Sequence, residues 1–431
     1  MSRRRRVKQS SLSSSCSKIV SSGGGHSASP IFLHRIAMPP PVSALRNALV
    51  LIAIASGIGD VGARQFVPTT DATVVETLRE QPLGAADRDF RRLRAQLRAR
   101  PADLALALAV AQRAIEIARR DGDPRFLGYA QAALTPWWSL ADPPPSVRVM
   151  KAVLLQSTHA FAPALAELDA VLRMSPNNAQ AWLIRVAILQ VQGKYADATH
   201  ACDQLRTAGA VLYASVCRAE LTGLTGDNAS ARTQLAQLIA ATAAGGSSSP
   251  ALSSWLALIE AEMAERDGDA LAADRHYRLA LKDAGDAYAK AAYADFLLDQ
   301  NRSREVIKLL ERDQRADALL LRLAIAYQRE KDDRLTAAAT SLKARFDAAR
   351  LRGDTVHQRE EARFNLQLLA QPAAALSLAK QNWATQKESG DTRILLEAAR
   401  AAGDQATIAA ARDFMHTNRI VDRRLTPLLA E

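Results

Sequence analysis

Residues 174–205, MSPNNAQAWLIRVAILQVQGKYADATHACDQL, contain two short apolar patterns separated by a turn signal. Trp182, Val186 and Leu189 are spaced i, i+4 and i+7, which places them on one face of a helix. Gly193 follows, and glycine adopts the left-handed backbone that ends a helix at little cost. A second stripe at helical spacing comes after the glycine: Tyr195, Ala198, Cys202 and Leu205. The stretch therefore predicts a pair of antiparallel helices.

This pattern resembles a tetratricopeptide repeat, in which large, small and turn residues recur about every 34 residues. Val186 is larger than the glycine or alanine that is usual at its place. The matching residues are Trp182, Val186, Leu189, Gly193, Ala198, Cys202 and Leu205. The resemblance implies an all-α fold, a right-handed superhelical solenoid of antiparallel helix pairs. It covers about 101–418 and is strong only over 146–310.

The turn residue recurs along the chain at nearly the period of that family. The candidates are His159, Gly193, Gly226, Gly268 and Asn301. One interval, from Gly226 to Gly268, is longer than the others, and it contains GGSSSP at 245–250, which indicates a loop inserted between repeats. Small residues keep phase with the turns where two helices must approach closely: Ala152, Val186, Ala219, Ala261 and Ala294 in first helices, and Ala164, Ala198, Ala231 and Ala273, with Val306 as the departure, in second helices.

The net charge of +11 is concentrated near the N-terminus. Residues 1–63 contain eight Lys or Arg and one acid, whereas later charges of both signs are interspersed. Nucleic acid is therefore not an expected partner. Residues 1–37 are rich in Ser, Gly and Arg, with too little apolar surface to fold. We interpret them as a disordered or non-native extension, and Met38 is an alternative start of the natural chain.

Residues 38–63 have the layout of a secretory signal peptide. Arg46 precedes an apolar run at 48–58, and small residues close the segment at Ala63. We expect cleavage between Ala63 and Arg64 and a periplasmic or otherwise exported protein. The alternative is an uncleaved anchor, which would be the only membrane contact.

The rest of the chain divides into an entry segment at 64–100, tetratricopeptide-like repeats at 101–310 and divergent helical repeats at 311–431. Six helices are expected in the last part, at 316–329, 335–351, 357–369, 373–386, 393–402 and 405–418. The predicted joints between them are Gly353, Pro372, Gly390 with Asp391, and Gly403 with Asp404.

Catalytic and metal-binding motifs do not emerge from the sequence. The histidines after the leader are scattered, and no zinc, phosphate-loop or nucleophile-elbow spacing occurs. His357 and Glu361 could form an acid–base pair, although a solvated helix face is the favoured interpretation. The sequence thus predicts a non-catalytic interaction scaffold without a cofactor or metal. The alternative is an enzyme or enzyme subunit with its site in the divergent C-terminal third.

The family resemblance also implies that the first helix of each repeat lines a concave groove that binds a protein or peptide. Transferring the groove-facing places gives nine candidate partner-binding residues: Gln180, Leu183, Gln190, Tyr213, Glu220, Trp255, Glu262, Tyr288 and Asp295. Acids recur at one of these places, which favours a basic or amphipathic peptide ligand. Alternatively, the aromatics pack between helices and the acids keep the surface soluble.

Cys202 and Cys217 are candidates for a disulfide. Each lies about seven residues from the turn near 209–210, so antiparallel helices would bring them to one level. An oxidising compartment would permit the bond. The alternative is two buried apolar residues.

Overall fold

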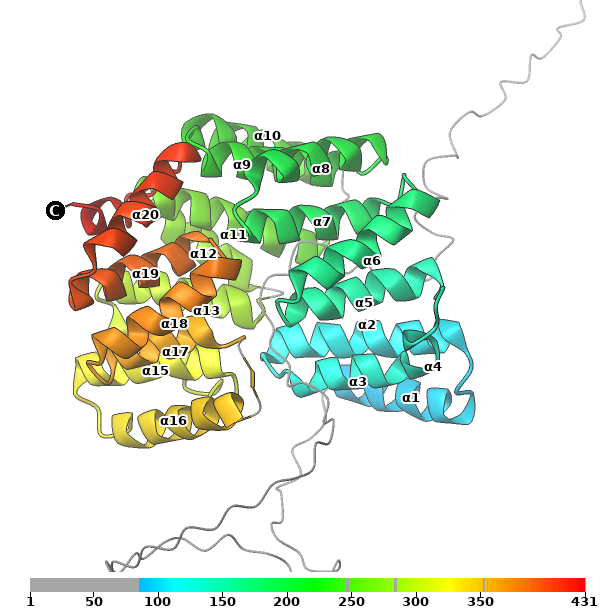
Figure 1. The fold of residues 1–431 in the computed structure, drawn as a ribbon, viewed down its shortest axis with the longest axis horizontal. Coiled ribbons are helices and arrows are strands. Elements are labelled where there is room, and N and C mark those ends of the chain that lie inside the picture. Colours follow the sequence, from blue (N-terminus) through cyan, green and yellow to red (C-terminus); the bar gives the residue numbers. More distant parts are fainter. Residues whose placement is uncertain (1–84, 245–248, 283–284, 352, 355, 431) are drawn as a thin grey trace, which may run out of the picture.

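The computed structural model describes residues 85–430 except 245–248, 283–284, 352 and 355. The predicted leader, its predicted cleavage site and residues 64–84 lie outside the described residues. Within them all regular structure is helical (Figure 1). The first ten helices are α1 (Ala85–Ala99), α2 (Leu104–Asp121), α3 (Arg125–Ala133), α4 (Thr135–Trp138), α5 (Pro145–Ser157), α6 (Phe161–Met174), α7 (Ala179–Val191), α8 (Tyr195–Thr207), α9 (Val211–Leu224) and α10 (Asn228–Ala244).

Ten further α-helices and a short 3-10 turn complete the array. They are α11 (Pro250–Asp267), α12 (Ala270–Lys282), α13 (Ala287–Asp299), α14 (Ser303–Leu310), α15 (Asp317–Glu330), α16 (Leu335–Leu351), α17 (Gln358–Gln367), α18 (Pro372–Thr385), α19 (Ser389–Ala402), α20 (Gln405–Thr417) and η1 (Thr426–Leu428). Consecutive helices pack on one another along the chain. An all-α array of neighbouring helix pairs is therefore confirmed.

The predicted turn residues all have left-handed backbone conformations. Their φ angles are 57° at His159, 72° at Gly193, 109° at Gly226, 77° at Gly268 and 56° at Asn301. Each comes directly after the first helix of a pair, so the chain reverses there and the second helix packs back on the first. Histidine and asparagine are among the few residues other than glycine that tolerate this conformation.

The small residues that keep phase with these turns are buried in the helix interfaces. Those of the first helices are at most 4% exposed, and those of the second helices are fully buried: Ala152, Val186, Ala219, Ala261 and Ala294, then Ala164, Ala198, Ala231, Ala273 and Val306. Close approach of two helices leaves no room for larger side chains, because protein interiors are densely packed. The core is therefore a series of apolar clusters along the array.

The array bends so that its C-terminal helices lie against its middle (Figure 1). The backbone N–H of Lys387, just before α19, donates to the carbonyl of Val191 in α7 at 2.7 Å. The Gln386 amide contacts His159 at 3.0 Å. At the other side of the bend, α2 packs against α13. Segments that are far apart in the sequence therefore touch.

The C-terminal third contains the expected six helices, but one predicted joint is wrong. Gly390 and Asp391 lie inside the first turn of α19, which begins at Ser389. Glu388 and Asp391 form a capping box there, with the Glu388 N–H donating to Asp391 at 3.0 Å. This cap stabilises a helix start one turn before the predicted one. The joints at Gly353 and Gly403 have φ angles of 69° and 73°.

The structure joins Cys202 in α8 and Cys217 in α9 by a disulfide. Their Cα atoms are 6.1 Å apart, inside the limit of about 7 Å for a disulfide. Both side chains are buried in a cluster with Val186 and Leu189. The bond thus links the second helix of one pair to the first helix of the next.

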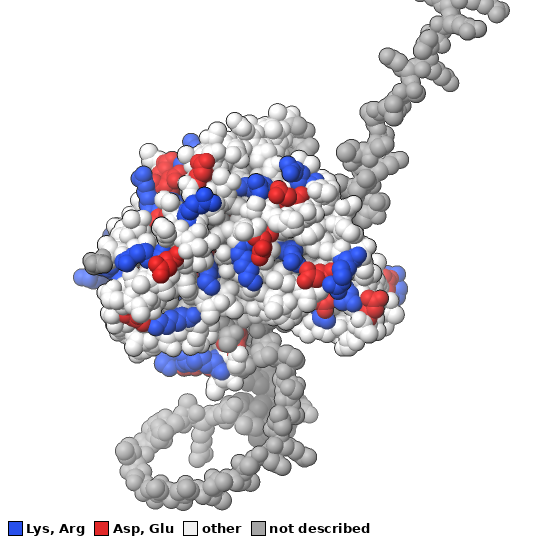
Figure 2. All heavy atoms as spheres, turned by 45° about the horizontal axis from the view of Figure 1, so that its top comes forward, with Lys and Arg blue, Asp and Glu red and all other residues white. Residues whose placement is uncertain are grey.

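The surface carries mixed charge. On the face shown in Figure 2, Lys and Arg side chains alternate with Asp and Glu. Several arginines of the described chain form ion pairs with acids nearby in sequence, such as Arg125 with Asp123. Among the described helices, none combines the length and apolar character needed to cross a membrane.

Candidate functional site

A cavity of about 180 Å³, the central cavity, lies between the middle helices of the array and its C-terminal helices. Side chains of α7, α9, α11 and α13 form one wall, and side chains of α15, α17 and α19 form another. Its lining is rich in ionisable groups of both signs: Glu220, Glu262, Glu265, Asp295, Glu360, Glu388 and Glu397, with Arg266, Arg322, Arg359, Arg363, Arg393 and Arg424.

Five of the nine predicted partner-binding residues meet in this cavity: Gln190, Glu220, Glu262, Tyr288 and Asp295. They come from α7, α9, α11 and α13, the first helices of four successive pairs. Groove-facing places of first helices therefore converge on one space. The acids of the predicted row all belong to this set.

The other four predicted residues lie elsewhere. Gln180 is exposed, and Leu183 is buried with Leu205 and Ala214. Tyr213 and Trp255 stack on each other, with ring centroids 5.9 Å apart, and Trp255 is 2% exposed. For these two aromatics, packing between helices is the observed arrangement.

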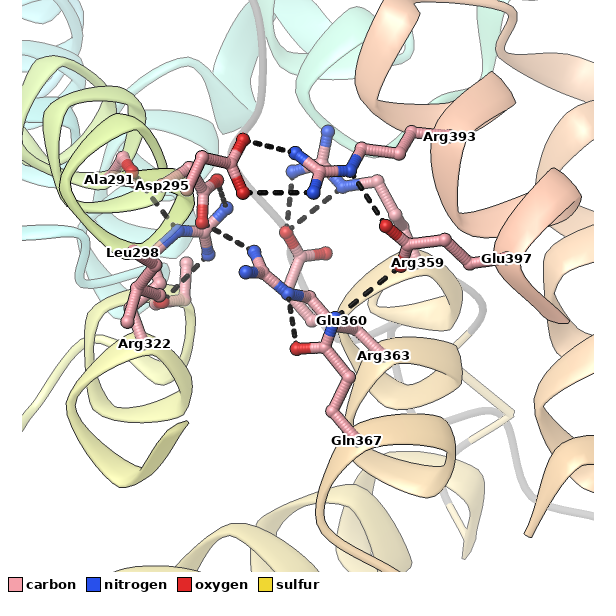
Figure 3. Close-up of polar contacts among 12 residues, drawn as sticks. Ala291, Asp295, Leu298, Arg322, Arg359, Glu360, Arg363, Gln367, Arg393 and Glu397 are labelled. Atoms are coloured by element: carbon pink, nitrogen blue, oxygen red, sulfur yellow. Dashed lines mark hydrogen bonds and ion pairs between the residues drawn. The ribbon is translucent and has the colours of Figure 1, made fainter. Parts of the chain in front are cut away.

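Asp295 is held by two arginines from separate helices (Figure 3). Arg322 of α15 donates to it at 2.6 Å, and Arg363 of α17 donates to its other oxygen. Burial alone would raise the pKa of Asp295, but the two guanidinium groups hold that pKa well below its usual range. Arg322 is itself only 4% exposed and also donates to the carbonyl of Ala291 at 3.1 Å. Asp295 of α13 is therefore linked by ion pairs to both α15 and α17.

Arg393 of α19 extends this network (Figure 3). It forms an ion pair with Asp299 of α13 and another with Glu397 one turn along its own helix, at 2.7 Å. Gln367 of α17 accepts from Arg363 at 3.1 Å and donates to Glu397 at 3.4 Å. Polar contacts thus connect α13, α17 and α19 across the cavity wall.

A second group of ion pairs involves the segment after α20. Arg424 pairs with the buried Glu265 of α11 at 3.0 Å and with Asp422 at 2.6 Å. The Tyr277 hydroxyl donates to the same Glu265 carboxylate at 2.6 Å. Burial raises the pKa of Glu265, and the contacts with Arg424 and Tyr277 oppose that rise.

Glu220 and Glu262 have neutral hydrogen-bond partners. The Gln190 amide donates to Glu220 at 2.7 Å, and the Tyr288 hydroxyl donates to Glu262 at 2.6 Å. Burial raises the pKa of Glu220 to about 7, and the charge of Glu262 adds to the rise. Glu220 therefore changes charge near neutral pH.

Sequence reasoning missed the arginines that meet these acids. Arg363, Arg393 and Arg424 belong to no motif, and their partners on α13 and α11 lie far away in the sequence. Only the bend of the array brings them to the central cavity.

A larger cavity, of about 640 Å³, opens beside the central one. It is lined from three parts of the chain, at 122–159, 287–291 and 315–391. Residues on both sides of residue 311 line each of the two cavities. Glu361 of the proposed acid–base pair contacts Arg350. In the described ranges no cluster of metal-ligating side chains occurs.

No protein-family model matches this chain, and no curated protein matches it. These comparisons therefore assign the chain to no family.

Proposed function

We propose that this chain is a right-handed solenoid of the tetratricopeptide type and acts as a protein–protein interaction scaffold of the cell envelope. The turn residues support the repeat assignment, because five positions chosen from the period of the family all have positive φ. The buried small residues in phase with them give a second, steric support. Stacked repeats of this kind create an extended concave binding surface.

The observation that carries the proposal is the chemistry of the concave face. Its acids already hold arginine side chains of the same chain: Asp295 holds Arg363, and Glu265 holds Arg424. Carboxylates placed in this way select guanidinium groups by charge and by hydrogen-bond geometry. A basic or amphipathic peptide is the ligand that such a face favours, and nucleic acid is not.

Export is part of the same proposal. The leader at 38–63 has signal-peptide character. A disulfide between Cys202 and Cys217 suits an oxidising compartment, because thiols stay reduced in the cytosol. Both features are consistent with a periplasmic location.

Affinity capture from the envelope fraction, followed by mass spectrometry, tests the function. The identified partner is then titrated against the purified Glu220→Gln/Glu262→Gln variant, which removes two carboxylates but keeps their shapes. We expect affinity to fall at least fivefold. Asp295 is not substituted, because its loss would leave the buried Arg322 without a counter-ion.

The matched control is Asp197→Asn. Asp197 lies exposed on α8, a second helix, away from the central cavity. It should leave affinity unchanged. Equal binding by the wild-type chain and the double variant would contradict recognition by the concave acids.

A further inference from the structure

The segment 414–425 lies along one edge of the array. This edge, the turn edge, is formed by three successive turn glycines, Gly193, Gly226 and Gly268. The three turns belong to the pairs α7–α8, α9–α10 and α11–α12. The segment comprises the end of α20 and the residues that follow it, so it crosses three repeats in a row.

Each glycine of the turn edge is in close contact with the segment. A Cβ atom at Gly193 would lie 2.8 Å from the Phe414 ring. At Gly226 it would lie 3.0 Å from the carbonyl oxygen of Arg419, and at Gly268 it would lie 3.0 Å from the Arg423 side chain. A side chain at Gly193 would therefore force the Phe414 ring to move, and one at Gly226 or Gly268 would crowd the segment. Glycine at these positions allows the close approach of the segment as well as the left-handed backbone of the turn.

Apolar contacts anchor the first half of the segment. Phe414 and Ile420 pack on the buried cluster that contains Leu189 and Tyr195. The Phe414 and Tyr195 rings have centroids 6.5 Å apart, which is within the range for aromatic pairs. The residues of this cluster come from α7, α8 and α9. The segment therefore packs on a core formed by helices that lie far from it in the sequence.

Polar contacts anchor the second half. The backbone N–H of Arg423 donates to the carbonyl of Arg266 at 3.0 Å. The next residue, Arg424, places its guanidinium on the buried carboxylate of Glu265 at 3.0 Å. An aromatic anchor, a backbone hydrogen bond to the docking surface and an arginine on a buried carboxylate are together the features of a docked peptide.

We propose that residues 414–425 are an intramolecular ligand, and that the turn edge with Glu265 is a docking site for a partner segment of the same chemistry. That segment has an aromatic residue and, about ten positions later, an arginine that lies in a turn. This proposal depends on the proposed scaffold function, and it specifies the chemistry of the partner that the scaffold binds. Because a tethered ligand has an effective concentration on the order of millimolar, a partner must displace it to bind.

The test uses the full chain and a fluorescent synthetic peptide with the sequence of residues 413–429. Arg424→Gln weakens the hold on the chain's own segment and leaves the Glu265 carboxylate for the peptide's arginine. We expect this variant to bind the peptide at least tenfold more tightly than the wild-type chain does. Hydrogen exchange of residues 419–425 should accelerate in the variant and stay fast when the peptide is added, because the peptide then occupies the site that the segment has left.

Val421→Thr is the control, because Val421 lies within the segment and its side chain is exposed to solvent. It should bind the peptide as weakly as the wild-type chain does. A peptide that carries glutamine in place of the arginine for Glu265 should not bind Arg424→Gln. A second protein variant, Ile420→Ser, loosens the segment through its apolar anchor and should also gain peptide affinity.

Peptide affinity that stays at the wild-type level in both loosened variants would overturn the proposal, as would equal binding of the glutamine peptide. This assay needs no natural partner. Loss of the docking site and loss of the scaffold function are therefore separable: the peptide assay reports on the first, and capture dependent on Glu220 and Glu262 reports on the second.

Discussion

Replacing Glu220 with glutamine should stabilise the protein at alkaline pH. Burial raises the pKa of this carboxyl from 4.5 to about 7, so the folded state holds its proton more tightly than the unfolded state does. At about 1.4 kcal/mol per pKa unit, the separation of the two values corresponds to roughly 3 kcal/mol. The amide of glutamine keeps the shape of the protonated acid and carries no charge at any pH.

The sign of the pH dependence follows from proton binding. Between pH 4.5 and 7 the folded state binds more protons at Glu220 than the unfolded state does, so the free energy of unfolding falls as pH rises. The contribution is complete below about 4.5 and lost above about 7. Glu220→Gln should remove this part of the slope and raise stability at pH 8 by up to roughly 3 kcal/mol.

Urea unfolding followed by circular dichroism, at pH 5, 6, 7 and 8, measures the effect. Asp197→Asn, on an exposed face, should leave the slope as it is. A Glu220→Gln variant with the wild-type slope, or with lower stability at pH 8, would refute the reasoning. It would mean that Arg266, the positive charge acting on Glu220, stabilises the carboxylate fully.

Three further predictions concern other parts of the chain. Asp295→Ala should cost about 3–5 kcal/mol in urea unfolding because it leaves Arg322 buried and unpaired, and a cost below about 1 kcal/mol would contradict a buried ion pair. Reducing the bond between Cys202 and Cys217 should cost about 3 kcal/mol, the value for a closed loop of this length; an unchanged urea midpoint after reduction, verified by thiol titration, would contradict it. Sequencing of the native N-terminus should begin after Ala63, whereas a cytosolic chain that starts at residue 1 would exclude export.

The local architecture was predictable because it depends on short-range chemistry. A glycine that ends a helix and an alanine at a helix crossing act within one repeat, so Gly193 and Ala219 could be placed from spacing alone. The start of α19 was missed because an acidic capping box outweighed the glycine signal at Gly390.

The candidate site was predictable only in part. The acids of the concave face follow from their places in the first helices, since those places repeat. The positions of their arginine partners cannot be predicted in this way. The contact between Asp299 and Arg393, for example, depends on how far the whole array bends. Small changes in the angle at each repeat add up over many helices, and no single residue pattern encodes the sum.

The contact of residues 414–425 with the turn edge also has a consequence for how the chain folds. Repeat arrays ordinarily gain structure by propagation between neighbours, which involves only short loops and is fast. Here the final step must join the α7–α8 pair to the end of α20, at the far end of the array, and such a contact pays the closure entropy of a long loop. During synthesis, the middle helices emerge well before the segment that covers Gly193. Their apolar edge is then open to solvent, so the nascent chain is most prone to association in that interval, and a chaperone that binds apolar surface would act there.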